Sequence, residues 1–282
     1  MKKLYNITSF LAPSVPLSVK RIFYTVWTFW IDRHNDAEVN KDPVLILGNH
    51  KAGTTVIAVL LAEISGLSVA TGIKKQMLKP LYDRVRNGEI DFSEFVDTNK
   101  KDFSKDILKE NQLTFLYEEL LKYFSKPKFI FVIRDPRDNI RSILNRMNIP
   151  GNLDDIKPQH IKNISPAQKL VINNRWLGID SGNYIEILAA RWKLASEVYL
   201  KNAENMILIR YEDFNENKVE EISHLAKKLS YPLINDISSL VDIQYQPRGD
   251  REVIWEEFFG YKNLKKIETI CDESMKRFTY QV

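Results

Sequence analysis

Three short apolar runs set the fold class of this chain. They cover residues 43–47, 128–133 and 206–210. Strands that are buried on both faces of a sheet read as continuous apolar runs rather than as alternating ones. Segments with helical patterns lie between the runs, at 54–65, 136–148 and 184–202. This alternation predicts an α/β fold of three layers, with a central parallel sheet flanked by helices.

The remaining segments are less regular. We predict a further strand at 67–71, short helices in the charged stretch 74–111, an amphipathic helix at 113–124 and loops over 151–182. Neither a repeat nor a low-complexity linker divides the chain, so we predict a single domain over residues 1–282, with residues 1–40 as a helical N-terminal extension.

A strongly apolar and aromatic segment spans residues 22–31 and follows Lys20 and Arg21. It is about half as long as the roughly 20 residues that a helix needs to span a bilayer. No small-residue cleavage site follows it, which argues against a signal peptide. We predict a helix packed on the core; contact of residues 20–31 with a membrane interface or an acceptor pocket is the alternative.

The charge balance is mildly basic, with 41 lysines and arginines against 37 acidic residues and a net charge of +4. This balance suits one pocket for an anion and predicts no nucleic-acid-binding surface. Cys271 is the single cysteine and the four histidines are scattered. We therefore predict no disulfide, no metal site and a location in the reducing cytoplasm.

The segment from Gly48 to Thr55 reads Gly-Asn-His-Lys-Ala-Gly-Thr-Thr and joins a predicted strand to a predicted helix. Glycines let the backbone curl around an anion, and free N–H groups at the helix start point at it, reinforced by the helix dipole. We predict a phosphate-binding loop here; a plain strand–turn–helix corner is the alternative.

This loop differs from a Walker A loop, G-x-x-x-x-G-K-S/T, in the place of its lysine. Gly48 and Gly53 have the right spacing, but Thr54 stands at the lysine position, and the lysine is Lys51. A lysine inside the loop can reach the bridging oxygen of a leaving phosphate and neutralise charge there. The pattern therefore weakens the prediction of an enzyme that uses ATP and Mg²⁺.

A second motif begins where the strand at 128–133 ends. Arg134 lies at the carboxyl end of that strand, where open α/β sheets bind ligands, and Ser142 lies about two helical turns further on. Arginine can form a bidentate pair with a phosphate, and the serine adds a hydroxyl donor. Asp135 and Asp138 can fix the loop and the arginine. The alternative is a surface cluster of salt bridges.

These segments resemble those of the cytosolic and Golgi sulfotransferases, which use 3′-phosphoadenosine 5′-phosphosulfate (PAPS). The family's 5′-phosphosulfate loop, of the form P-K-S-G-T-T, is matched by His50-Lys51-Ala52-Gly53-Thr54-Thr55. Its 3′-phosphate motif, R-N/D-P-x-D-x-x-x-S, is matched by Arg134-Asp135-Pro136-Arg137-Asp138 and Ser142. Its R-Y-E-D-L segment is matched by Arg210-Tyr211-Glu212-Asp213-Phe214. The matches frame residues 43–214.

The resemblance implies a role for each matched residue. Lys51 would stabilise the leaving phosphate. The 5′-phosphate would be held by the loop residues Gly53, Thr54 and Thr55, together with His50 and Ala52. The 3′-phosphate would be held by Arg134 and Ser142. The donor would be PAPS, the product 3′-phosphoadenosine 5′-phosphate (PAP), and no metal is required. By the same resemblance Tyr184 is our candidate for packing on the adenine, and Arg248 with Gly249 for closing the 3′-phosphate site.

The general base is where the sequence departs from the family. Golgi-type members carry a glutamate where Thr71 and Gly72 stand here, and the cytosolic type carries a histidine in the region of Lys109-Glu110-Asn111. Glu110 is the nearest carboxylate and is predicted as the catalytic base. The rivals are His50, Asp97 and His160, and an amine acceptor would relax the need for a strong base.

The predicted reaction is transfer of a sulfuryl group to a hydroxyl or amine of a small-molecule or sugar acceptor. Residues 1–40, 74–111 and 151–182 are expected to line the acceptor pocket. Two alternatives come from other classes: a P-loop kinase that uses ATP and Mg²⁺, and a non-catalytic nucleotide-binding protein.

Overall fold

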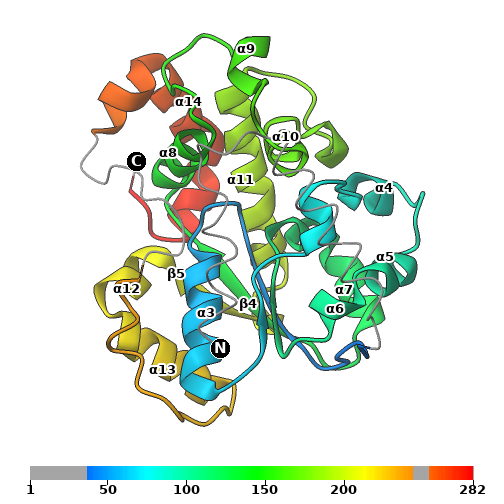
Figure 1. Ribbon diagram of the computed structural model, residues 1–282. Helices are drawn as coiled ribbons and strands as arrows, with labels where there is room; N and C mark the ends of the chain where they lie inside the picture. Colours follow the sequence, from blue (N-terminus) through cyan, green and yellow to red (C-terminus); the bar gives the residue numbers. More distant parts are fainter. Residues whose placement is uncertain (1–36, 244–253, 282) are drawn as a thin grey trace.

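A computed structural model describes residues 37–243 and 254–281. Their centre is a five-stranded sheet in the order β2-β3-β1-β4-β5, in which every neighbouring pair is parallel (Figure 1). The strands are β1 (Val44–Gly48), β2 (Val69–Ala70), β3 (Ile107–Lys109), β4 (Lys128–Ile133) and β5 (Met206–Arg210). This confirms the predicted α/β class with a central parallel sheet flanked by helices.

One strand was not predicted from the sequence. β3 lies within residues 74–111, where the charged composition predicted short helices only, and it pairs with both β1 and β2. It consists of three residues between Asp106 and Glu110, so it shows no apolar run of its own. Its pairing therefore comes from the neighbouring strands, because tertiary contacts override a short local pattern.

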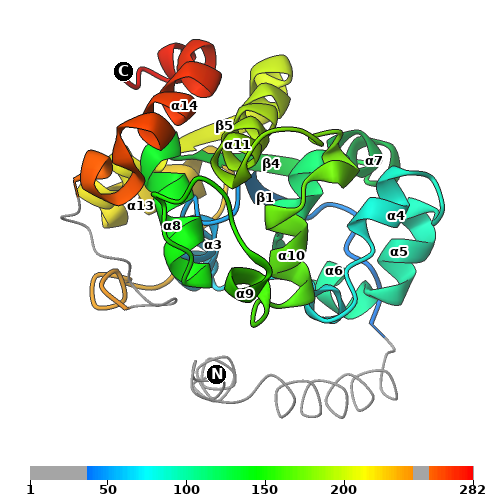
Figure 2. The ribbon, with the colours of Figure 1, turned by 90° about the horizontal axis from the view of Figure 1, so that it is seen from above.

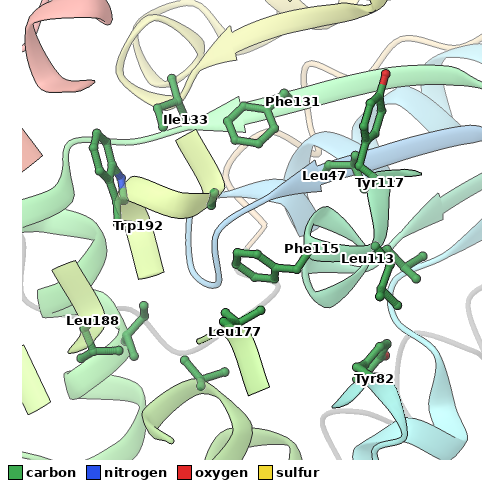
Figure 3. Close-up of a cluster of buried hydrophobic side chains, with 14 of the residues drawn as sticks. Leu47, Tyr82, Leu113, Phe115, Tyr117, Phe131, Ile133, Leu177, Leu188 and Trp192 are labelled. Carbon is green, nitrogen blue, oxygen red and sulfur yellow. The ribbon is translucent and has the colours of Figure 1, made fainter. Parts of the chain in front are cut away.

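Both faces of the sheet are buried, which explains the continuous apolar runs. Along β1, Val44 and Ile46 belong to one hydrophobic cluster, and Leu45 and Leu47 belong to the other. Alternate residues of β4 divide in the same way, with Phe131 and Ile133 on the side of Leu47 (Figure 3). Because side chains alternate along a strand, an all-apolar strand requires helices on both sides.

Helices of two groups cover these faces (Figures 1 and 2). On one face α3 (Thr54–Ser65) packs against α13 (Lys218–Lys228), and α12 (Tyr211–Glu216) follows β5 directly. On the other face α11 (Tyr184–Lys201) packs against α8 (Pro136–Met147) and α14 (Trp255–Arg277).

The smaller elements complete the second face. They are η1 (Lys74–Met77), α4 (Tyr82–Arg86), α5 (Phe92–Thr98), α6 (Lys100–Phe103), η2 (Asn111–Leu116), α7 (Tyr117–Tyr123), α9 (Pro158–Ile161), α10 (Pro166–Ile172), η3 (Arg175–Leu177) and η4 (Ala203–Asn205). The single amphipathic helix predicted at 113–124 is thus a 3₁₀ segment followed by a short α-helix. The predicted loops at 151–182 contain three short helical elements.

The order of the strands places a topological switch point at the carboxyl end of β1. From β1 the chain moves to β2 and β3 on one side and then crosses to β4 and β5 on the other. Ligands of open α/β sheets bind at such a switch point, outside the carboxyl ends of the strands. The segments that follow β1, β3, β4 and β5 therefore meet at one edge.

Within the described ranges, no helix is long and apolar enough to cross a membrane. The apolar segment at 22–31, the N-terminal extension and the pair Arg248 and Gly249 lie outside the described residues.

Candidate active site

The loop between β1 and α3 is shaped by three residues with positive φ. Gly48 has φ 139°, and a Cβ there would lie 2.4 Å from the carbonyl oxygen of Val132. Gly53 has φ 98°, and its Cβ would lie 2.2 Å from the ring of Tyr211. Lys51 has φ 67°, a left-handed conformation that is rare outside glycine. The loop is therefore held in a sharp turn, with Lys51 at its tip.

The N-cap residue of α3 is a glycine, so it offers no capping side chain. Gly53 makes no side-chain cap hydrogen bond, and no acidic residue lies within the first turn of the helix. The first N–H groups of a helix have no partner inside the helix, and its dipole places partial positive charge at this end. A phosphate is the natural ligand of such an end.

Three asparagines hold the loop in this shape. The amide of Asn111 donates to the carbonyl oxygens of Gly48 (2.9 Å) and Asn49 (3.0 Å) and to the hydroxyl of Thr54 (3.1 Å). The amide of Asn139 donates to the carbonyl oxygen of His50 (2.9 Å), and that of Asn49 donates to Oδ1 of Asn139 (2.8 Å). Asn111 follows β3 and Asn139 lies in the first turn of α8, so the loop is tied to both neighbouring strand ends.

A buried guanidinium braces this network. Arg191 of α11 is 0% exposed and donates to Oδ1 of Asn49 (3.1 Å), Oδ1 of Asn174 (2.6 Å) and Oε1 of Gln112 (2.7 Å). Its guanidinium carbon lies 4.4 Å from the ring centre of Phe115. These partners are all neutral amides, and burial lowers the pKa of Arg191 to about 9. The positive charge that it keeps below that pH faces the loop.

Arg134 stands where β4 ends, as predicted. One of its terminal nitrogens donates to the carbonyl oxygen of Lys51 (3.4 Å), and its guanidinium lies 4.6 Å from the ring centre of Tyr211. Its Nε is buried and has no hydrogen-bond partner among the described residues. A buried N–H without a partner is costly. The orphaned donor therefore fits an anionic ligand beside the loop.

The acidic residues of the second motif do not pair with Arg134. Asp135 caps α8 by accepting from the backbone N–H of Arg137 (2.9 Å), and it pairs with the Arg137 guanidinium (2.7 Å). Asp138 accepts from Arg141 (2.9 Å) and from the indole of Trp255 (3.1 Å). Both carboxylates fix the start of α8, on which Ser142 lies two turns further along, partly buried.

The third motif, Arg210-Tyr211-Glu212-Asp213-Phe214, contacts the second motif, which begins at Arg134. Glu212 accepts from the backbone N–H of Asp135 (2.9 Å) and from the phenol of Tyr280 (2.8 Å). Tyr211 packs on Gly53 and on the Arg134 guanidinium. The Arg-Tyr-Glu-Asp segment therefore contacts both the loop after β1 and the segment after β4.

Cations dominate the electrostatics of the loop. Burial lowers the pKa of Lys51 to about 8, with further contributions from Arg146, Arg134 and Lys109. Lys109, the last residue of β3, is 7% exposed, and burial lowers its pKa as well. A bound anion reverses these effects, because an opposite charge nearby favours the protonated amine. Positive charge is thus concentrated at the loop, which suits an anionic ligand.

The predicted loop residues are brought together, with two refinements. Ala52 is buried in the core beside α3, so it contributes to the loop by packing. Thr54 is also buried, and its hydroxyl contacts Asn111. Thr55 is partly exposed at the start of α3. Lys51, Gly53 and Thr55 are therefore partly exposed in the loop, whereas Ala52 and Thr54 are buried.

Glu110 and Tyr184 have different surroundings from those expected. Glu110 caps η2: its carboxylate accepts from the backbone N–H groups of Ile73 (3.1 Å) and Gln112 (3.1 Å). Tyr184 is 1% exposed, and its phenol donates to the carbonyl oxygen of Pro150 (2.7 Å). The ring of Tyr184 has no open face for an adenine, so its place in this structure favours a packing role.

Sequence reasoning missed the side chains that hold the site together. Asn49, Asn139 and Arg191 were not singled out, although Arg191 interrupts the apolar stretch of a helix predicted to face the core. A charged residue in such a stretch signals a buried polar network. Among the described residues, no cluster of three or more histidine, cysteine or acidic side chains could hold a metal ion.

This is a P-loop-like α/β fold in which the helix start after β1 and Arg134 at the end of β4 lie side by side. The chain belongs to the sulfotransferase family, because the model of the sulfotransferase domain matches residues 41–246. That membership supports a transferase activity of the sulfotransferase class. No curated protein matches the chain in sequence.

Solved structures of sulfotransferases share the fold at low sequence identity. The sulfotransferase domain from the curacin biosynthetic pathway is 13% identical, with a TM-score of 0.51, over 87% of this chain and 100% of that domain. The sulfotransferase STF9 from Mycobacterium avium is 14% identical, also with a TM-score of 0.51, over 90% of this chain and 82% of that protein. At these identities the likeness concerns the fold alone.

Proposed function

We propose that this protein transfers the sulfuryl group of PAPS to a hydroxyl or amine of a small-molecule or sugar acceptor. The observation that carries the proposal is the pairing of an uncapped helix N-terminus, with Lys51 at the tip of its loop, and Arg134 with an orphaned buried Nε. Two anion sites on neighbouring strands suit a nucleotide that carries phosphate groups at both its 5′ and 3′ positions.

Each residue has a physical task in this proposal. Lys51 neutralises the charge that develops on the departing phosphate oxygen. The N–H groups at the start of α3 hold the 5′-phosphate, and Arg134 with Ser142 holds the 3′-phosphate. When bound, PAPS supplies an activated sulfuryl group on a phosphate leaving group. The asparagine network keeps these donors oriented before the ligand arrives, which saves reorganisation during the reaction.

The kinase alternative is less well supported. Thr54 occupies the position of the Walker lysine, and its buried hydroxyl contacts Asn111. No cation projects from that position toward the phosphates of ATP. The non-catalytic alternative does not account for Lys51, because a protein that only binds the nucleotide needs no charge at the bridging oxygen.

Calorimetric titration tests the proposal. PAP, and separately ATP with Mg²⁺, would be titrated into the wild type, Arg134→Ala and the control Arg277→Ala, which changes an exposed arginine at the end of α14. We expect PAP to bind without metal to the wild type and the control, and at least about tenfold more weakly to Arg134→Ala, since a charge-assisted bond contributes roughly 1.5–3 kcal/mol. Binding of ATP with Mg²⁺ but not of PAP would overturn the proposal in favour of the kinase.

A further inference from the structure

Arg191 is a buried cation whose hydrogen-bond partners are all uncharged. It is 0% exposed, and it donates to the side-chain oxygens of Asn49 (3.1 Å), Asn174 (2.6 Å) and Gln112 (2.7 Å). The described residues provide no ion pair for it. A buried charge without a charged partner is unfavourable, and an apolar residue of similar size would avoid that cost. Packing alone therefore does not explain the guanidinium.

The guanidinium fixes the direction of a chain of amide hydrogen bonds that ends in the loop after β1. A guanidinium only donates, so the oxygen of Asn49 must face it, and Nδ2 of Asn49 is left to donate. That group donates to Oδ1 of Asn139 (2.8 Å), and Nδ2 of Asn139 donates to the carbonyl oxygen of His50 (2.9 Å). All bonds of this relay point from Arg191 toward the loop, and aligned hydrogen bonds polarise one another. Two side chains thus link Arg191 to the backbone next to Lys51.

The acidic side chains nearby do not balance the positive charge at this place. Glu110 is the carboxylate whose charge acts on Arg191, and it also acts on Lys109, which is 7% exposed at the end of β3. The oxygens of Glu110 accept from the backbone N–H groups of Ile73 and Gln112, and among the described residues no ion pair joins it to either cation. One carboxylate does not offset two buried cations, so a positive charge remains beside the loop in the free protein.

We propose that Arg191 is a positioning residue of the nucleotide site and that the phosphates of the bound nucleotide supply its missing counter-charge. This inference rests on the proposed function. The relay orients the loop before the nucleotide arrives. The charge of Arg191 acts on the anion through oriented dipoles in a water-poor interior, where electrostatic interactions are strong. The same charge that weakens the free protein therefore strengthens the complex.

A purely structural role of Arg191 makes a different prediction. If Arg191 only braced the fold, a carboxylate in place of one neutral partner would leave nucleotide binding unchanged. If its charge belongs to the site, that carboxylate competes with the nucleotide for the guanidinium. Gln112 is the suitable position, because its side-chain oxygen accepts from Arg191, whereas the relay to the loop runs through Asn49.

Calorimetry with PAP and urea denaturation of Gln112→Glu test the inference. The matched control is Gln159→Glu, which makes the same change of charge at an exposed position of α9. We expect free Gln112→Glu to be at least as stable as the wild type, because Arg191 gains a charged partner, and to bind PAP at least about fivefold more weakly. The control should match the wild type in both measurements. Unchanged PAP affinity of Gln112→Glu, or a less stable free protein, would overturn the inference.

Variants of Arg191 itself separate its charge from its hydrogen bonds. Arg191→Lys keeps a positive charge with three donors, and Arg191→Gln keeps hydrogen-bonding groups without a charge. We expect Arg191→Lys to bind PAP at least about fivefold more tightly than Arg191→Gln. Equal affinities would show that the charge of Arg191 does not act on the nucleotide. Failure of the wild type to bind PAP would instead refute the proposed function, and the stability of free Gln112→Glu would still test whether Arg191 lacks a counter-charge.

Discussion

Lys51 combines a left-handed backbone with a side chain surrounded by other cations. Two hydrogen bonds hold this backbone: Arg134 donates to the carbonyl oxygen of Lys51, and Asn139 donates to that of His50. Burial, and after it the neighbouring arginines and Lys109, destabilise the ammonium and so lower the pKa of Lys51 in the free protein. Strain and repulsion of this kind persist at functional sites because a ligand relieves them.

The affinity for PAP is predicted to depend on pH through Lys51. Its pKa is lowered to about 8 in the free protein, and a bound anion raises it. Binding is therefore strongest below pH 8 and weakens as the pH rises above 8, by at most about tenfold per pH unit for one proton. Calorimetry from pH 7 to 9.5 measures this. Lys51→Met should bind more weakly at pH 7 and lose the dependence; an unchanged slope in the variant would assign it to another group.

Arg191→Met is predicted to destabilise the fold by about 2–4 kcal/mol, because three buried amide oxygens lose their donor. Urea denaturation followed by circular dichroism measures the change in the free energy of unfolding. Arg175→Met, at an exposed position of η3, is the matched control and should change it by less than about 0.5 kcal/mol. Equal stabilities of the two variants would show that the network contributes little.

At the scale of elements, the sequence predicted those parts whose pattern is local. β4 and β5 lie over the predicted residues, and α3 begins and ends as predicted at Thr54 and Ser65. β3 was not predicted, because its three residues form a strand only through their pairing with β1 and β2. The hydrogen-bond network of Asn49, Asn139 and Arg191 was not predicted either, because it also depends on contacts between distant parts of the chain. Its members are up to 142 positions apart.

The start of α3 depends on close approach as well as on backbone conformation. Gly53→Ala would place a Cβ against the Tyr211 ring and force a positive φ on alanine. Gly88 also has a positive φ (74°), but nothing lies within 4 Å of its Cβ position. We expect the free energy of unfolding to fall by about 1–2 kcal/mol in Gly88→Ala and by about 2–5 kcal/mol in Gly53→Ala. Gly53→Ala should also bind PAP more weakly. Urea denaturation of both variants separates the two costs; equal losses would refute a role for the contact with Tyr211.

The molecule as a whole ties its C-terminal residues to the site. The Arg137 guanidinium donates to the carbonyl oxygen of Gln281 (2.7 Å), and the Tyr280 phenol donates to Glu212. Residues after α14 thereby reach the loop that follows β4, although they are far from it in the chain. The prediction of one domain over residues 1–282 agrees with this contact but stays a prediction, because residues 1–36 and 244–253 lie outside the described ranges.

Tyr280→Phe tests this long-range support. The phenol is buried, and burial together with Glu212 raises its pKa, so it remains a hydrogen-bond donor throughout the neutral pH range. Removing it leaves one oxygen of Glu212 without its donor, at a cost of about 1–2 kcal/mol. Since the other oxygen of Glu212 holds the backbone of Asp135, next to Arg134, we also expect weaker PAP binding. Tyr261→Phe, at a position 71% exposed, is the matched control. A loss of stability without any change in PAP affinity would mean that the C-terminal residues support the core but not the site.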